Sequence, residues 1–330
     1  MLSESVALKK NRDANKTLRF GPNSVYRYGR ISDRLRQTTA LLILLLATIS
    51  KPLALTGNLD QLDTDKIQLG SVNALIYDID NSRVLYSKNE HKVVPIASIT
   101  KIMMAMVVLD SKQPLDEWIT IRKPKNKGKK NAYSRIRMGS RLRRKHLLLL
   151  ALMSSENVAS GVLGEAHPGG IDAFVKAMNA KAKSLGMTDT HFADSSGLSP
   201  ENISTPSDLL KMILAASRYR LIRQYSTTPK YGAYFRKPRY VLHYANTNLL
   251  IRRGTWDLTL SKTGYLTEAG RCLVMIGQIE GNNIAMVFLD AFGKHTPVGD
   301  AGRVKNWLTK GNSGKVSLAA RQYEQSKNAR

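Results

Sequence analysis

The sequence contains a single cysteine, few aromatic residues and half as many acidic as basic residues. One cysteine cannot form a disulfide within the chain, and without a C-x-x-C pair neither a zinc finger nor a thiol redox centre is expected. Cys272 lies in the apolar run 272–276, where it is expected to be a small buried hydrophobic residue. The histidines are scattered and form no H-E-x-x-H motif, so the sequence predicts no metal and no cofactor.

The shortage of acidic residues leaves a formal net charge of +26. A charge of this size bears on partners rather than on fold, and it fits nucleic acid, an anionic membrane surface or an acidic cell-wall polymer. The charge is densest at 122–145, where there are twelve Lys and Arg residues and no acid. This segment is interpreted either as a solvated basic face or as a docking surface for an anionic cell wall or membrane. Because Tyr133 is its only aromatic residue, it offers little base stacking, and nucleic acid is not expected as a partner.

No apolar run is long enough to cross a bilayer comfortably as a helix, which takes about 20 residues. The run 39–49 is about half that length and follows a basic leader, a pattern typical of the hydrophobic region of a secretory signal. A buried core helix is the alternative. We interpret residues 1–55 as a basic leader with a signal peptide or anchor, and 56–70 as a linker. The protein is therefore expected to be exported to the periplasm, and to stay attached to the inner membrane if the leader is not cleaved.

The remaining pattern predicts strands at both ends and helices between them. Strands are expected at 73–78, 83–86, 258–265, 271–279 and 284–292, and helices at 102–109, 147–163, 171–185, 205–213 and 299–309. This order indicates an α+β fold in which a helical insertion interrupts an antiparallel sheet. The expected main domain spans 71–310, with a sheet part at 71–97 and 235–310 and a helical part at 98–234. The polar tail 311–330 is expected to be loose.

One candidate site begins with Ser98-Ile99-Thr100-Lys101, at the predicted start of a helix. Residues three apart share a helix face, so the Lys101 amine can reach the Ser98 hydroxyl. A serine alcohol is a weak nucleophile until a base takes its proton, and a desolvated lysine can serve as that base. At a helix start the Ser98 N–H is also available to an oxyanion.

Two further short motifs follow in order. Ser155-Glu156-Asn157 lies in a helical, apolar setting, where its hydroxyl and amide can point into a cleft or where Ser155 can simply cap a helix. Lys262-Thr263-Gly264 lies on the strand predicted from residue 258. A lysine and a hydroxyl followed by glycine suit a strand edge that binds a carboxylate and lets a substrate backbone approach closely.

S-x-x-K, S-x-N and K-T-G in this order are the signature of penicillin-binding proteins and serine β-lactamases. Across residues 73–307 the sequence resembles the low-molecular-weight penicillin-binding proteins of the D-alanyl-D-alanine endopeptidase (penicillin-binding protein 7) type. Longer stretches carry this resemblance, notably 153–157, 168–170, 173–179, 196–198, 246–249 and 290–294. The resemblance implies the DD-peptidase/β-lactamase fold, with the active site in a cleft between the sheet and a helical subdomain.

By the same resemblance, the enzyme hydrolyses D-alanyl-meso-diaminopimelate cross-links of peptidoglycan and is acylated by β-lactam antibiotics. Ser98 would attack the penultimate D-Ala carbonyl, Lys101 would act as base, and Ser155 would relay a proton to the leaving amine. The implied substrate-binding residues are Asn157, Lys262, Thr263, Gly264 and Tyr265, with the Tyr265 N–H completing an oxyanion hole. Peptidoglycan stem peptides carry free carboxylates, which also gives the positive charge a partner.

Two related activities remain as alternatives. A D-alanyl-D-alanine carboxypeptidase, which trims stem pentapeptides, would use the same chemistry on a different leaving group. Residue 265 is Tyr where carboxypeptidase relatives often carry His, which favours the endopeptidase. A class A β-lactamase would need a carboxylate that activates the deacylating water, and Glu201 is its only candidate in the appropriate stretch.

Overall fold

The computed structural model describes residues 59, 62–122 and 133–329. The predicted leader, including the run 39–49, lies outside these residues, and so do residues 56–58, 60 and 61 of the predicted linker and part of the basic segment 122–145. In the part described, no helix combines the length and the apolar character that a membrane span requires.

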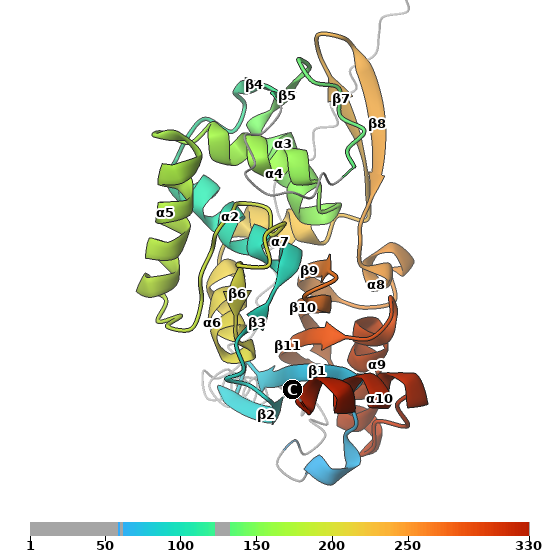
Figure 1. Cartoon of the computed structure of the whole chain (residues 1–330). Coiled ribbons are helices and arrows are strands. Elements are labelled where there is room, and N and C mark those ends of the chain that lie inside the picture. The colour runs from blue at the N-terminus through green and yellow to red at the C-terminus, as the bar shows by residue number, and fades with distance from the viewer. Residues whose placement is uncertain (1–58, 60–61, 123–132, 330) are drawn as a thin grey trace, which may run out of the picture. The chain divides into compact units, whose positions relative to one another are not determined.

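The central layer is a five-stranded antiparallel sheet in the order β2-β1-β11-β10-β9 (Figure 1). Its strands are β1 (Ser71–Asp78), β2 (Arg83–Lys88), β9 (Leu258–Leu266), β10 (Gly270–Ile279) and β11 (Asn282–Ala291). The first strand pairs with the last, Leu75 opposite Val287, so segments far apart in the sequence lie side by side. The α+β prediction, with an antiparallel sheet interrupted by a helical insertion, is confirmed.

Alternating residues of the strands bury two separate cores, one on each face of the sheet. Leu75 and Val287 belong to the core shared with the helical part. Ile76 and Met286, one position along, belong to the core under the C-terminal helices with Trp307. Strands covered on both faces are apolar at nearly every position, which is why the sequence shows them as continuous runs.

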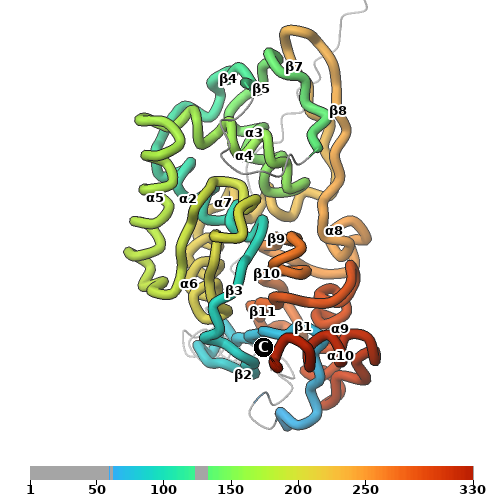
Figure 2. Tube along the Cα trace, in the orientation of Figure 1, coloured from blue at the N-terminus to red at the C-terminus, as the bar shows by residue number. Residues whose placement is uncertain are grey.

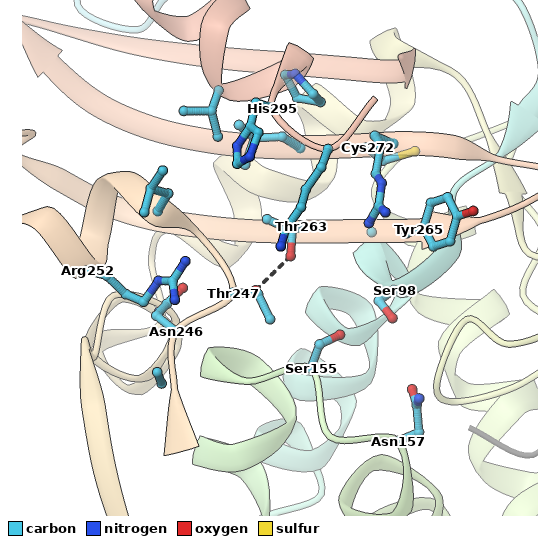
Figure 3. A pocket seen from close by; sticks show the side chains of 18 residues that line it. Ser98, Ser155, Asn157, Asn246, Thr247, Arg252, Thr263, Tyr265, Cys272 and His295 are labelled. Carbon is cyan, nitrogen blue, oxygen red and sulfur yellow. Dashed lines mark hydrogen bonds between the residues drawn. The ribbon is translucent and has the colours of Figure 1, made fainter. Parts of the chain in front are cut away.

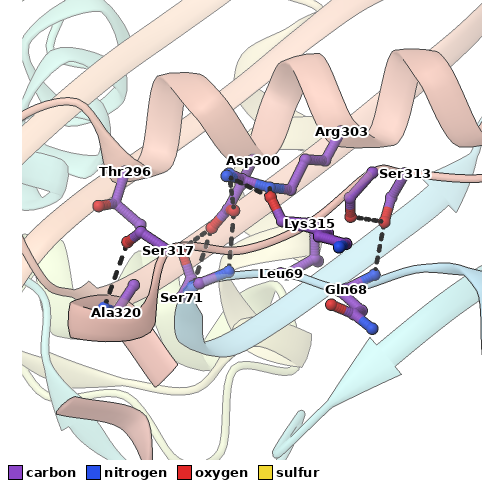
Figure 4. A network of polar contacts seen from close by, with 12 residues as sticks. Gln68, Leu69, Ser71, Thr296, Asp300, Arg303, Ser313, Lys315, Ser317 and Ala320 are labelled. Atoms are coloured by element: carbon purple, nitrogen blue, oxygen red, sulfur yellow. Dashed lines mark hydrogen bonds and ion pairs between the residues drawn. The ribbon is translucent and has the colours of Figure 1, made fainter. Parts of the chain in front are cut away.

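Helices cover both faces of the sheet (Figures 1 and 2). α6 (Pro206–Ala216) packs on β1, β10 and β11, and α9 (Thr296–Lys310) packs on the same three strands within the second core. Asp300 of α9 accepts hydrogen bonds from the Gly70 N–H at 2.9 Å and the Ser71 N–H at 2.8 Å (Figure 4). This buried carboxylate therefore fixes the start of β1 against α9.

The helical part lies between β2 and β9 in the sequence. It contains η3 (Ala97–Ile99), α2 (Thr100–Asp110), α3 (Arg144–Met153), α4 (Asn157–Glu165), α5 (Gly170–Ser184) and α7 (Arg220–Ser226). Short two-stranded pairs join β3 (Val94–Pro95) to β6 (Ile203–Ser204) and β4 (Trp118–Thr120) to β5 (Arg141–Arg143). The helix predicted over 147–163 is two helices, because the chain breaks at 154–156.

The boundary predicted at residue 235 is wrong. Residues 230–245 form a separate hairpin of β7 (Lys230–Phe235) and β8 (Tyr240–Ala245), which bridges to Arg141 of the helical part through Arg236. Its residues alternate like those of a sheet strand, but β7 and β8 pair with each other and not with the main sheet. The main sheet resumes at β9, after the short helix α8 (Leu249–Arg253).

The tail is also not loose. Residues 318–328 form helix α10 (Leu318–Asn328), which packs against β1. The Tyr323 hydroxyl donates to Asp290 at 2.6 Å, and Lys88 of the sheet pairs with Glu324 at 2.7 Å. The tail's polar composition therefore reflects contacts to charged groups at the sheet margin.

Candidate active site

A cleft of about 540 Å³ lies where the helical part meets β9 and brings the three predicted motifs together (Figure 3). Residues from all three motifs line it, namely Ser98, Ser155, Asn157, Thr263, Gly264 and Tyr265. The two remaining predicted residues, Lys101 and Lys262, are fully buried behind these side chains.

Ser98 lies in the single-turn helix η3, directly before α2. The Lys101 ammonium is 2.9 Å from the Ser98 hydroxyl and 2.7 Å from the Asn157 side-chain oxygen. Because α2 is apolar and buried on nearly all sides, it holds Lys101 in the interior with its amine aimed back at the serine. The structure thus places a nucleophile and an amine at hydrogen-bonding distance, as the spacing predicted.

Ser155 lies outside a regular helix, with φ at 60°. It does not cap α4, since the Glu156 side chain accepts from the Val158 N–H and fills that position. The left-handed conformation, which non-glycine residues rarely adopt, directs the Ser155 side chain into the cleft. There the Lys262 ammonium is 2.9 Å from the Ser155 hydroxyl.

Burial lowers the pKa of Lys101 to about 7, against the opposing influence of the Asp194 and Glu156 carboxylates. An ordinary lysine is almost fully charged at neutral pH, whereas this one has a substantial neutral fraction. The neutral amine can accept the proton of Ser98. The electrostatics of the site therefore supply the base that the chemistry requires.

Burial also lowers the pKa of Lys262 well below its ordinary value, and the positive charge of Lys101 lowers it further. Two buried ammonium groups in one site repel each other, so each favours the neutral form of the other. Among the described residues, the Lys262 amine donates to the Ser155 hydroxyl and to the Thr263 carbonyl oxygen, the latter at 2.8 Å. A negatively charged ligand beside Lys262 would reverse this effect and stabilise its ammonium.

The loop 194–202 completes the site, although no catalytic role was predicted for its backbone. The Ser196 carbonyl accepts a hydrogen bond from Lys101. Burial acts to raise the pKa of Asp194, but N–H donors from Ser199, Ser196 and Gly197 outweigh it and hold this pKa below its ordinary value. The motif Ser196-Gly197-Leu198 was the only signal, because a backbone carbonyl leaves no trace in residue type.

Two glycines allow backbones to meet beside Ser98. Gly197 has φ at 78°, and a Cβ there would lie 2.0 Å from the Ala97 carbonyl oxygen. A Cβ on Gly264 of β9 would lie 3.2 Å from the Ser98 nitrogen. The strand therefore approaches the nucleophile more closely than a side chain would permit.

β9 presents the last predicted residues to the cleft. The Thr263 hydroxyl donates to the Thr247 hydroxyl at 2.7 Å, which holds it at the cleft wall (Figure 3). Tyr265 is 52% exposed, and the Arg271 guanidinium stacks on its ring at 3.7 Å from the centroid. Thr247 and Arg271 also line the cleft, but they were not singled out as site residues because neither belongs to one of the three motifs.

Two other sequence hypotheses can be compared with the geometry. Glu201 is exposed and does not line the cleft, so the structure gives no support for a β-lactamase-type deacylation. Within the described ranges, no cluster of His, Cys, Asp or Glu is arranged to hold a metal ion.

Much of the described part of the basic segment makes internal contacts. Arg143 and Lys145 both pair with Asp116, and the buried Arg144 pairs with Glu117. Arg137 stacks on Tyr240. These residues support the fold as well as carrying charge.

The fold, together with two buried lysines that each contact a serine hydroxyl, defines a class of active-site serine peptidases. A sequence model of the S11 peptidase family, described as D-alanyl-D-alanine carboxypeptidase, matches residues 60–293. The chain belongs to this family of serine peptidases, and the resemblance inferred from the motifs is confirmed.

The curated relatives agree. The chain is 49% identical over 256 residues to a D-alanyl-D-alanine endopeptidase of Pseudomonas aeruginosa, covering 78% of this chain and 83% of that protein. It is 44% identical over 288 residues to a D-alanyl-D-alanine endopeptidase of Escherichia coli, covering 87% of this chain and 93% of that protein.

Solved structures show the same fold. The Streptomyces K15 DD-transpeptidase matches with a TM-score of 0.67 at 24% identity, covering 74% of this chain and 98% of that one. Penicillin-binding protein D2 from Listeria monocytogenes, in its cefotaxime-bound form, matches with a TM-score of 0.64 at 26% identity, covering 74% and 99%.

Proposed function

We propose that this peptidase is a DD-endopeptidase that cuts D-alanyl-meso-diaminopimelate cross-links of peptidoglycan and is acylated by β-lactams. The observation that carries the proposal is the contact of Ser98 with a buried Lys101 whose pKa lies near 7. The identity to proteins named endopeptidases supports a cross-link as the substrate. The cefotaxime-bound relative supports β-lactam binding.

In the proposed reaction, neutral Lys101 takes the Ser98 proton while Oγ attacks the D-Ala carbonyl carbon. The N–H groups of Ser98 and Tyr265 stabilise the oxyanion. The amide C–N bond then breaks, and the proton returns through Ser155 to the leaving amine. Water then attacks the resulting ester and gives a proton to Lys101. The C–O bond to Ser98 breaks as Lys101 returns this proton to Oγ, which releases the acid and restores the free enzyme.

Substrate binding would complete the electrostatics of the site. A carboxylate beside the scissile amide can accept hydrogen bonds from Thr263 and approach Lys262, which has no acidic partner among the residues that the structure describes. Its negative charge would raise the pKa of Lys262 and make the contact an ion pair. Asn157 would then hold both the substrate amide and Lys101.

A second candidate is the D-alanyl-D-alanine carboxypeptidase activity, which the description of the family model favours. Both activities use the same acyl-enzyme and differ only in the leaving group. The higher identity of the chain to endopeptidases favours cross-links as the main substrate, as compared with 30% identity to a carboxypeptidase of Bacillus subtilis.

We further propose that the chain acts in the periplasm, exported by its basic leader, with no nucleic acid as partner. The exposed residues of the segment 122–145 would hold it near anionic cell wall or membrane surface. The support is the net charge of +26 and the signal-like run 39–49.

The test is incubation of the chain, without its leader, with cross-linked muropeptide dimers, followed by mass analysis of the products. We expect conversion of dimers to monomers by the wild type and none by Ser98→Ala. Labelling by a fluorescent penicillin should show the same dependence on Ser98. Release of single D-Ala with intact dimers would replace the endopeptidase by the carboxypeptidase, and labelling of Ser98→Ala would contradict the assigned nucleophile.

A further inference from the structure

The cleft extends past the reacting groups, and its far part is cationic. The charged residues among those that line it are Arg252, Arg271 and Lys294, and His295 lies beside them. In the described chain no Asp or Glu lines this cleft. The whole cleft therefore favours anionic ligands, including the region away from Ser98.

Arg252 and Arg271 both line the cleft, but their guanidinium groups have different surroundings. Arg271 is engaged with Tyr265, whereas the Arg252 guanidinium makes no hydrogen bond or ion pair within the part of the chain that the structure describes. In Figure 3 the hydroxyl pair of Thr263 and Thr247 lies between Ser98 and Arg252. A ligand that reaches Arg252 must therefore extend beyond the carboxylate position at Thr263.

The backbone that carries Arg252 is firmly attached to the catalytic strand. Asn248 starts α8 by accepting from the Leu250 N–H, and its amide donates to the Ser261 hydroxyl of β9 at 2.9 Å. Asn246 braces this turn by accepting from the Asn248 N–H at 2.9 Å. Because Ser261 directly precedes Lys262, α8 holds Arg252 at a fixed place relative to the carboxylate site.

The two candidate substrates differ at this distance from the serine. A peptide that ends in D-Ala-D-Ala has one leaving residue with one carboxylate, which Thr263 and Lys262 would take. In a cross-linked dimer the leaving group is the side-chain amine of a diaminopimelate. This diaminopimelate has a carboxylate at the same place and carries a whole second stem peptide beyond it. That second peptide has further free carboxylates.

We propose that Arg252 binds a second carboxylate, carried by the leaving stem peptide, and so favours cross-linked dimers over peptides that end in D-Ala-D-Ala. Guanidinium and carboxylate form a charge-assisted, bidentate pair. The contact is available only to the longer leaving group. Arg252 is thus a specificity-determining residue, and this inference rests on the proposed hydrolysis of cross-links.

The test compares Arg252→Ala with Arg253→Ala, a neighbour on α8 that is also exposed but does not line the cleft. Values of kcat/KM are measured for a muropeptide dimer, for the same dimer with the far carboxylates of its leaving peptide amidated, and for a pentapeptide ending in D-Ala-D-Ala. We expect Arg252→Ala to lower kcat/KM for the free dimer about tenfold and to leave the pentapeptide unchanged. Arg253→Ala should match the wild type on all three substrates.

Amidation of the dimer should lower kcat/KM of the wild type by the same factor of about ten. It should not lower kcat/KM of Arg252→Ala further, because amidation and the substitution remove the same contact. Equal losses on dimer and pentapeptide, equal losses in the two variants, or no loss in Arg252→Ala would each overturn the inference while leaving the proposed function intact. A wild type that releases D-Ala but cuts no dimer would overturn the proposed function itself.

Discussion

The helical side and the sheet side of the cleft each bury one lysine, in different electrostatic surroundings. Lys101 of α2 lies near two carboxylates, Asp194 and Glu156, which raise its pKa against the effect of burial. The pKa of Lys262 on β9 is lowered both by burial and by the charge of Lys101, with no such carboxylate in the described part of the chain to oppose them. The protein itself therefore holds the pKa of Lys101 near 7, whereas Lys262 has no counterion among the described residues.

Because of this difference, the two lysines suit two different tasks, proton transfer and carboxylate binding, which the residue type alone does not distinguish. A group that accepts and returns a proton needs a pKa near the working pH, and the helical side provides it. A group that binds a carboxylate needs its opposite charge only when the ligand is present. The sheet side therefore has an incomplete ion pair that an anionic substrate would complete.

The largest effect is expected from Lys101→Met, which keeps the volume and removes the amine. Without the base, we expect the rate of acylation by penicillin to fall about a thousandfold. The wild-type rate should rise with pH through an inflection near 7, because only the neutral amine of Lys101 can take the Ser98 proton. Stopped-flow or gel-based acylation rates across pH 5 to 9 measure both, at roughly constant ionic strength.

A Lys101→Met enzyme that acylates as fast as the wild type would assign the base to another group. Circular dichroism and the unfolding temperature serve as the control for the fold, because methionine fills the space of the lysine but leaves the Asn157 and Ser196 oxygens without their donor.

A smaller effect, about a hundredfold, is expected from Lys262→Met, and it should depend on the substrate. The wild type should prefer a peptide with a free terminal carboxylate over its amide, since the carboxylate restores the charge of Lys262. The variant should lose this preference and hydrolyse both slowly. Steady-state kcat/KM for the two peptides measures the discrimination, and an unchanged preference would place the carboxylate elsewhere.

The comparison also shows what the sequence could predict. Lys101 and Lys262 lie on regular elements, so three-residue helical spacing and an apolar strand pattern were enough to place them. The central sheet and the helical insertion followed from the same periodicities. Ser155 was found by its motif, but the helix break that directs it into the cleft was not, because a left-handed residue has no sequence signature of its own.

Other features depend on contacts between distant segments. The Ser196 carbonyl accepts a hydrogen bond from Lys101 of α2, which is distant in the sequence, and α10 is held by the pairing of Tyr323 with Asp290. The hairpin 230–245 has strand periodicity, yet its pairing partners decide that it stays outside the main sheet. Periodicity predicts an element and its buried face, whereas the partner of that face depends on the tertiary structure.

The smallest effect is expected from Asp194→Asn. This variant tests most directly whether the carboxylates near Lys101 cause its difference from Lys262. The Asp194 charge raises the pKa of Lys101, so its removal should lower that pKa. Lys101 would then become neutral at lower pH, and the acidic limb of the acylation profile should move to lower pH. The rate at high pH should fall by about tenfold, because the neutral amide has one acceptor oxygen for the N–H groups of the loop.

The matched control is Asp172→Asn, which removes the same charge from an exposed position in the first turn of α5. Its profile should coincide with that of the wild type, since a solvated charge away from Lys101 is screened. If Asp194→Asn lowered the rate without moving the acidic limb, Asp194 would act only by shaping the loop. If the limb moved to higher pH, the carboxylates of the helical side would not be what balances Lys101, and the contrast with Lys262 would need another cause.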